Sequence, residues 1–334
     1  MTELKKYLTT EIKDFLFTEL NEDFLDSSDL SFLIQVPIPI KQEDLKDFTK
    51  DGLSTTKIAD NMAIVLGADM EFKYAPFYIR YLRKLFDEKL VMVFCDQAEK
   101  LILKDQYRKA ICYLRAALQL DPNGLQSMYC YANGCRIWYQ SMEGTDDEEL
   151  ITLLKADANE YFSHVTNMYP EFAPAWYFLG FAYLNAGAYT KASLAFKHYI
   201  ANADGQPDED IKEVKERLDE LEDPIKIEEG KNLLMAGRIE EALRILEPYV
   251  DTKYSKWWPL HFYLAVAYEN LGHDTEAIEG YLKVLNLNPS NYDAMVALSE
   301  LYEKMGDEEK ARKYSQKAKI VLENNGKAVS DTLS

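Results

Sequence analysis

The side chains most often used in catalysis and metal binding are few and scattered in this sequence. Its four histidines, His164, His198, His261 and His273, form no HExxH-type arrangement, so a zinc site of that kind is not expected. No GxGxxG or GxxxxGK[ST] run occurs, and no GxSxG elbow surrounds a serine. We therefore expect no catalytic, cofactor-binding or metal-binding residues and no enzymatic activity.

The four cysteines form no redox or metal motif. Cys95, Cys112, Cys130 and Cys135 make no CxxC pair and fall within helical patterns. A buried thiol in such a pattern behaves as a small apolar group. We expect reduced core cysteines, which is typical of a cytoplasmic protein.

Charge and hydropathy limit the partners that the chain can have. The sequence holds 38 Lys and Arg against 57 Asp and Glu, a formal charge of -19, so this is an acidic protein that repels nucleic acid and anionic lipid. Its first twenty residues alternate charged and apolar groups, without the apolar core of a secretory signal. With no apolar run of about 18 residues either, we expect neither a nucleic-acid nor a membrane partner.

A period of 34 residues organises the C-terminal part of the chain. Like residues recur at that spacing in three pairs: Gly272 and Gly306, Tyr268 and Tyr302, and Ala277 and Ala311. An upstream segment shows the same pattern, with Trp176, Leu179, Gly180, Tyr183, Gly187, Ala192 and Phe196. A fixed period of this length is typical of stacked repeats.

The residue types at the repeated positions predict pairs of antiparallel helices. Small residues allow two helices to approach closely, and Gly180, Ala265 and Ser299 occupy that position on the first helix of three repeats. Ala192, Ala277 and Ala311 occupy the facing position on the second helix. Gly187, Gly237, Gly272 and Gly306 stand where a first helix is expected to end in a left-handed turn.

This combination of residues and spacing resembles the tetratricopeptide repeat, over about residues 91–325. The resemblance implies an all-α fold, a solenoid of helical hairpins wound as a right-handed superhelix, with an N-terminal helical cap region. We expect these parts: residues 1–90, N-terminal; three repeats at 91–124, 125–172 and 173–206; an extra helix at 207–222; three repeats at 223–257, 258–291 and 292–325; and a flexible tail at 326–334.

The resemblance also implies where a ligand binds. In tetratricopeptide arrays the first helices line a concave groove, and by register the groove residues here are Tyr129, Asn133, Arg136, Tyr177, Phe181, Asn185, Lys231, Phe262 and Asn270. The carboxylate clamp of chaperone-binding members needs a Lys one turn before an Asn, but Tyr129 precedes Asn133. A chaperone tail is therefore not expected. The groove is aromatic and apolar in its middle and acidic at its C-terminal end, which favours a segment with apolar and basic residues.

Residues 1–90 lack the small-residue positions but show helical spacing over 4–20, 42–48, 54–66 and 72–89. The run SFLIQVPIPI between the first two is expected to be extended because of its prolines. Residues 57–67 are faintly similar to a helix-turn-helix, but the next helix is aromatic rather than basic. The region is either a cap on the first repeat or a separate effector module.

The sequence thus predicts a non-catalytic adaptor or scaffold that binds another protein or peptide. One alternative is a peptide-responsive regulator with residues 1–90 as its effector module, similar in layout only to bacterial peptide-sensing regulators. A further alternative is a self-assembling structural protein, because a homo-oligomer could form through Trp257–Trp258 or the last helix. The identity of the partner is not encoded in these patterns.

Overall fold

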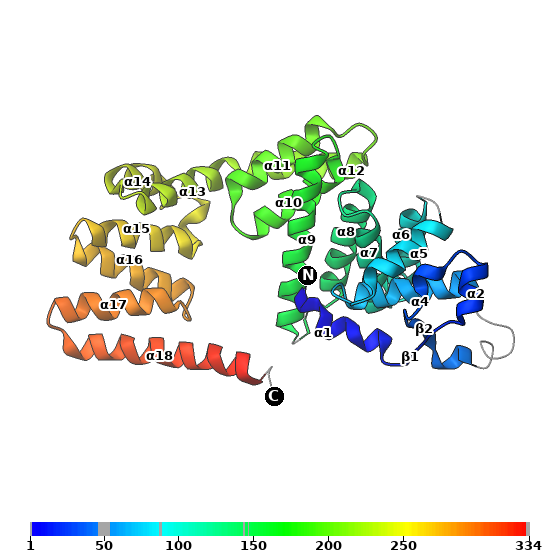
Figure 1. Cartoon of the computed structure of the whole chain (residues 1–334). Coiled ribbons are helices and arrows are strands. Elements are labelled where there is room, and N and C mark those ends of the chain that lie inside the picture. Colours follow the sequence, from blue (N-terminus) through cyan, green and yellow to red (C-terminus); the bar gives the residue numbers. More distant parts are fainter. Residues whose placement is uncertain (1, 46–53, 87–88, 143, 146, 332–334) are drawn as a thin grey trace. The chain divides into compact units, whose positions relative to one another are not determined.

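The computed structural model describes residues 2–45, 54–86, 89–142, 144–145 and 147–331. The chain forms two compact units, Met1–Leu179 and Gly180–Ser334, which divide within a helix and are taken here one at a time. Figure 1 follows the elements through both units. Helices dominate both, so the chain is an all-α helical-repeat solenoid, as the sequence predicts. The boundaries of the individual repeats stay predictions.

Helical hairpins follow one another along most of the chain. In unit 1 they are α6 (Leu90–Ile102) with α7 (Tyr107–Leu120), and α8 (Leu125–Ser141) with α9 (Glu148–Met168). Helix α10 (Ala173–Asn185) passes from unit 1 into unit 2, where α11 (Tyr189–Ala201) and α12 (Asp208–Glu220) follow it. Unit 2 continues with α13 (Glu222–Met235) and α14 (Ile239–Leu246), α15 (Trp258–Asn270) and α16 (Asp274–Leu287), and α17 (Tyr292–Lys304) and α18 (Glu308–Asp331).

Insertions in the repeat pattern appear as helices. The extra helix expected at 207–222 is α12, and α8 and α9 are lengthened to 17 and 21 residues. Short 3-10 turns, η5 (Glu247–Tyr249) and η6 (Lys253–Lys256), lie between α14 and α15. Helix α18 continues to residue 331, through most of the segment predicted to be a tail.

Left-handed residues end the first helices, as predicted. The φ angles of Gly187, Gly237, Gly272 and Gly306 are 68°, 75°, 75° and 80°. At Gly272 the turn is closed by two backbone hydrogen bonds, Gly272 N–H to Glu269 O at 3.0 Å and His273 N–H to Tyr268 O at 2.9 Å. Asp105 takes the same place after α6, with φ 57°, and Gln106 N–H donates to Leu101 O. The turn is therefore common to the hairpins of both units.

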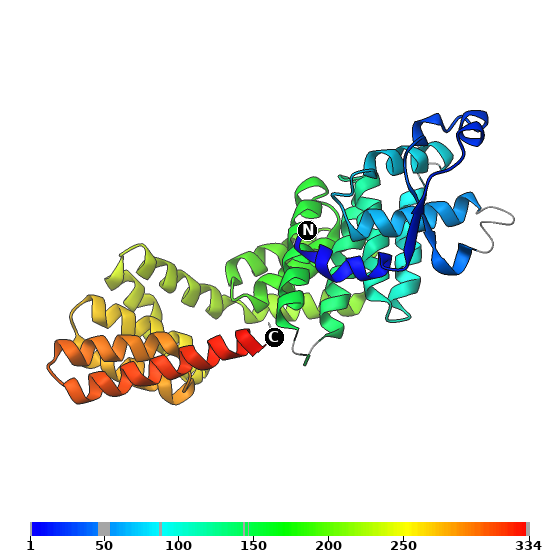
Figure 2. The ribbon, with the colours of Figure 1, turned by 60° about the horizontal axis from the view of Figure 1, so that its bottom comes forward.

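The small residues allow close helix contacts. A Cβ added to Gly180 would lie 2.4 Å from the Phe196 ring, and one added to Gly280 would lie 2.8 Å from the Ala265 Cβ. Ser299 Oγ donates to Ala311 O on the facing helix at 2.9 Å. In unit 2 the last two hairpins, seen side by side in Figure 2, share a buried core that includes Ala277 and Tyr281.

The N-terminal region is only partly helical. It comprises η1 (Thr2–Leu4), α1 (Lys5–Leu8), η2 (Thr9–Ile12), β1 (Phe15–Thr18), α2 (Glu22–Ser27), η3 (Ser31–Leu33), β2 (Ile38–Lys41), η4 (Gln42–Asp44), α4 (Thr55–Ala68) and α5 (Ala75–Leu85). The prediction of a helix over 4–20 is wrong beyond its first turns, because residues 15–18 pair with β2. Of the helix expected at 42–48, residues 46–48 lie outside the described part of the chain. Ser54 caps α4 as expected, accepting from Lys57 N–H at 3.2 Å.

The run predicted to be extended is extended only at its proline-containing end, where Ile38–Lys41 form strand β2, whereas Ser31–Leu33 form the 3-10 turn η3. Strands β1 and β2 are antiparallel, with Phe15 opposite Lys41 and Thr18 opposite Ile38. Side chains from α4 and α5 satisfy carbonyl groups in and just before β2: Asn61 Nδ2 donates to Pro39 O at 3.1 Å and Tyr78 Oη donates to Pro37 O at 2.5 Å. These hydrogen bonds attach the segment to α4 and α5. Proline has no backbone N–H, so Pro37 and Pro39 leave no donor unpaired in it.

Helix α4 packs directly on the first hairpin. Gly67 touches the backbone of α7, since a Cβ at that position would lie 1.9 Å from Cys112 O. Gln119 Nε2 also donates to Leu66 O at 2.7 Å. This packing gives Gly67 a structural role in place of the helix-turn-helix considered for residues 57–67.

The cysteines occupy the same core. All four are free thiols, with Cys95, Cys112 and Cys135 buried and Cys130 half-buried.

No helix within the described residues is both long and apolar enough to cross a bilayer.

Substituting Gly67 with alanine should weaken unit 1, because the new methyl group overlaps backbone rather than a mobile side chain. We expect a loss of at least about 2 kcal/mol, of the size seen when cores are overpacked. Gly134→Ala is the matched control: its Cβ would meet the Leu114 side chain end, which can move. Hydrogen exchange of α4 and α7 amides measures both, and equal effects would contradict the packing role of Gly67.

His261 should make unit 2 sensitive to acid. The side chain is 3% exposed, and burial lowers its pKa. The unfolded chain therefore binds this proton more readily, so the histidine's contribution to stability is present above about pH 6.5 and declines as the pH falls below it. Its Nε2 donates to Ser255 O at 2.8 Å, and Trp176 Nε1 donates in the same way to Pro170 O at 2.8 Å.

His261→Trp is consequently a conservative replacement, because tryptophan fills the equivalent position in another repeat. Thermal unfolding of both forms at several pH values checks the prediction. The stability of the wild type relative to His261→Trp should decrease as the pH is lowered through 6.5. A difference that does not change with pH would show that His261 does not titrate on unfolding.

Candidate functional site

In unit 1 the predicted groove residues of α8 are already engaged with one another. Arg136 donates from Nε and Nη2 to Asn133 Oδ1, at 3.0 and 2.9 Å, and from Nη1 to Gln140 Oε1 at 2.6 Å. Its guanidinium lies 4.2 Å from the centroid of the Phe178 ring, and burial lowers the pKa of Arg136. The arginine is thus held in one orientation by contacts within the unit.

The predicted aromatic residues of unit 1 pack on other rings. Tyr129 meets Phe172 edge-on at 4.9 Å, and burial raises the pKa of its hydroxyl. Tyr177 lies perpendicular to Phe178 at 5.3 Å. These contacts contribute to the core between helices, so in unit 1 the predicted positions serve packing at least as much as an open surface.

Unit 2 contains a cavity that brings two of the predicted residues together. Asn185, at the end of α10, and Lys231, on α13, both line a space of about 400 Å³. The rest of its lining comes from the end of α10 and the turn after it, from the start of α11, from α13 and from the first turns of α15. This cavity is the candidate site, and we call it the α13 cavity.

Aromatic side chains form much of the wall of the α13 cavity: Tyr189, Trp257, Trp258 and Tyr263. Tyr189 and Trp257 meet edge-to-face, with ring centroids 6.3 Å apart. Each of the four is half-buried, and Trp257 and Tyr263 also pack against the buried core around Leu246. Half-buried rings of this kind offer a large contact area that loses little side-chain entropy on binding.

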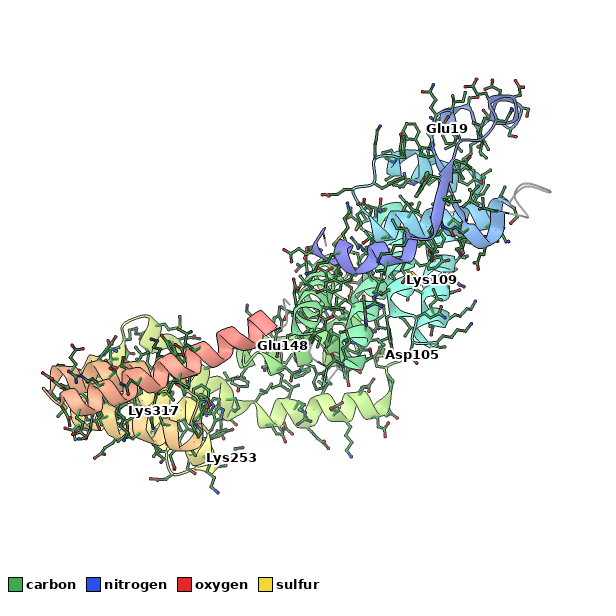
Figure 3. All side chains as sticks on the ribbon, turned by 90° about the horizontal axis from the view of Figure 1, so that it is seen from below. Glu19, Asp105, Lys109, Glu148, Lys253 and Lys317 are labelled. Carbon is green, nitrogen blue, oxygen red and sulfur yellow. The ribbon has the colours of Figure 1, made fainter. Side chains whose placement is uncertain are left out.

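The local sequence explains how the tryptophans reach this wall. Thr252 caps the short turn η6 through its side chain, which accepts from Tyr254 N–H at 3.3 Å. Trp257 then takes an extended conformation as the N-cap of α15, and Pro259 stands in the first turn of that helix. Figure 3 shows Lys253 on this connecting segment. The irregular connection therefore directs both tryptophans toward the end of α10.

Two charged residues line the α13 cavity, and they have different roles. Glu228 Oε2 accepts from Thr190 N–H at 2.7 Å and from Thr190 Oγ1 at 2.9 Å, so it caps the first turn of α11. Lys231 is half-buried and makes no ion pair or hydrogen bond with another described side chain. The cavity therefore presents an ammonium group without a recorded side-chain partner among the described residues, next to aromatic rings.

The other predicted residues of unit 2 lie outside this cavity. Phe181 packs edge-on against Phe196 at 5.0 Å, and Phe262 packs against Tyr281 at 5.7 Å. Asn270 Nδ2 donates to Val266 O of its own helix at 2.8 Å. Conversely, the repeat register does not predict Tyr189, Trp257 and Tyr263 as groove residues. Tyr189 and Trp257 stand at the starts of helices, where the register assigns no groove position. The Trp257–Trp258 pair was the one signal that could have pointed to them.

The stacked hairpins define the class of the protein, a helical repeat whose function depends on surfaces built by successive units. Tetratricopeptide repeat models match residues 155–207, 258–291 and 281–313. These segments of the chain are tetratricopeptide repeats. No significantly similar sequence was found among curated proteins.

Several solved structures are similar at low identity. The crystal structure of MamA is 18% identical, with 72% of this chain and 95% of that chain covered and a TM-score of 0.28. The tetratricopeptide domain of P58(IPK) is 17% identical, with 72% and 63% covered and a TM-score of 0.41. YrrB, described as having an unusual peptide-binding site, is 16% identical, with 66% and 98% covered and a TM-score of 0.27. These are likenesses of fold alone.

Removing the Glu228 carboxylate should loosen the start of α11. We expect Glu228→Ala to cost about 1 kcal/mol, the usual effect of losing a helix cap. Glu228→Gln keeps an oxygen that can accept from Thr190 and should lose less, the difference being the charge at the helix N-terminus. Hydrogen exchange of the amides of residues 189–192 reports the loss; unchanged exchange in both variants would mean that Thr190 does not depend on Glu228.

Proposed function

We propose that this chain is a non-catalytic scaffold that binds a polypeptide segment on the first helices of its repeats. One observation carries the proposal. Asn185 and Lys231, which the repeat register predicts as groove residues, both line a cavity whose wall contains half-buried aromatic rings. Such cavities bind apolar side chains, and repeat arrays bind extended or helical segments across successive units. The family supports the same class of function.

Charges along unit 2 support a preference for basic residues in part of that segment. Glu269 lies on α15, where it accepts from Tyr281 Oη at 2.6 Å, and Glu300 and Glu303 lie on α17. We propose that apolar residues of the partner fill the α13 cavity and that basic residues lie against α15 and α17. The acidic groups would then be matched by opposite charge.

Residues 1–90 are proposed to be a cap on the first hairpin rather than an effector module. Besides the Gly67 contact with α7, the Tyr113 hydroxyl of α7 is hydrogen-bonded to Asp60 of α4. Lys6 Nζ also lies 2.5 Å from Glu149 Oε1 of α9. A region that shares core and ion pairs with the repeats is suited to covering their end. Hydrogen exchange in α4 that changes on partner binding would instead support the effector alternative.

Site-specific crosslinking tests the scaffold proposal. A photoreactive phenylalanine analogue at position 185 should crosslink to a partner polypeptide in lysate of the source cells, because this position borders the cavity. The same analogue at the exposed position 197 on α11 serves as the matched control. Mass spectrometry identifies the products. Equal crosslinking at both positions would contradict a binding site here, and products that contain only this chain would indicate self-assembly.

A further inference from the structure

Two opposite charges line the α13 cavity, those of Glu228 and Lys231, and they differ in their partners. Glu228 Oε2 accepts from both donors of Thr190 at the start of α11, so this carboxylate is engaged with the helix N-terminus. Among the described residues, Lys231 makes no recorded ion pair or hydrogen bond, and the side-chain amide of the exposed Asn185 makes no recorded hydrogen bond. An ammonium and an amide N–H that line one cavity are a suitable donor pair for a carboxylate.

Apolar surface adjoins these two donors. Trp257, Trp258 and Tyr263 line the same cavity, and Pro259 lies between the second tryptophan and the rest of α15. Such a wall suits a large apolar side chain, because both partners lose water-exposed area on contact. The cavity thus combines one anion-binding position with one apolar position.

We propose that the α13 cavity binds an Asp or Glu side chain of an extended partner segment through Lys231 and Asn185, while the neighbouring large apolar residue packs on Trp257, Trp258 and Tyr263. This inference rests on the proposed function and specifies its ligand. Alternating residues of an extended segment point to opposite sides, so an acidic residue and an apolar residue two positions away face the cavity together.

The carboxylate is assigned to a side chain, not to the partner's C-terminus, because first helices continue on the far side of the cavity. Lys231 lies on α13, and the acidic residues Glu269 and Glu300 lie on the next two first helices, α15 and α17. A segment that continues across these helices meets first a positive and then two negative positions. The partner therefore carries its acidic residue at one end and its basic residues at the other, which fixes its orientation.

Selection from a random peptide library tests this inference. The peptides are displayed between fixed linkers at both ends, so that no free terminus is available, and the full chain is the target. The wild type should enrich peptides that contain an acidic residue close to a large apolar residue. Lys231→Glu should lose these peptides. The matched control is Lys197→Glu, the same charge reversal at an exposed position of α11, and this variant should retain these peptides.

A synthetic version of the most enriched peptide gives the quantitative test, with tryptophan fluorescence as the readout. Changing its acidic residue to the amide should raise Kd about tenfold on the wild type and leave Kd unchanged on Lys231→Glu, since the two changes remove the same interaction. Binding should also weaken as salt is added, because the ion pair is only partly buried.

The outcomes separate the two proposals. If the wild type enriches no peptide, peptide binding itself fails and the inference fails with it. If peptides are enriched but bind Lys231→Glu and the wild type equally, the scaffold function stands and the assignment of Lys231 is wrong. Tighter binding of a peptide with a free C-terminus than of its amidated form would also overturn the assignment to a side chain.

Discussion

Close approach between paired helices is the constraint on which the rest of this structure depends. At Gly180 and at Gly280 a single added methyl group would overlap the facing helix, and at Gly67 it would overlap the backbone of α7. Because the backbones come so near to one another at these points, large side chains must occupy the positions above and below them. The stack of hairpins, its aromatic core and its cavity in unit 2 all follow from that spacing.

The same constraint joins the N-terminal region to the repeats. Helix α4 has no repeat motif, yet it uses Gly67 to lie against α7 in the way that the repeat helices use their small residues. Strand β2 then lies over α4 and α5, where Asn61 and Tyr78 satisfy the carbonyl groups of two prolines. A solenoid end needs such a cover, since an uncovered hairpin exposes apolar surface.

Helix packing forms the α13 cavity, and the charged residues that line it determine what it can bind. Glu228 and Lys231 are one helical turn apart on α13, but only Glu228 meets a helix N-terminus. Its charge thereby serves the structure of α11, while the charge of Lys231 remains directed to the cavity. In unit 1 the cation of the same kind, Arg136, is held by Asn133, Gln140 and the Phe178 ring. The basic residue on this first helix of unit 1 is therefore held by its neighbours, whereas the basic residue on α13 lines a cavity.

The sequence alone determined the repeats, because their signals are local. Left-handed glycines such as Gly272, small residues such as Ala277 and the 34-residue period depend only on the geometry of one hairpin. It also predicts Asn185 and Lys231 as groove residues. Only the tertiary structure decided that these two share a cavity with Tyr189 and Trp257, that residues 15–18 form a strand, and that Asn133 is occupied by Arg136. Those outcomes depend on contacts between residues far apart in the chain, on which local helical spacing carries no information.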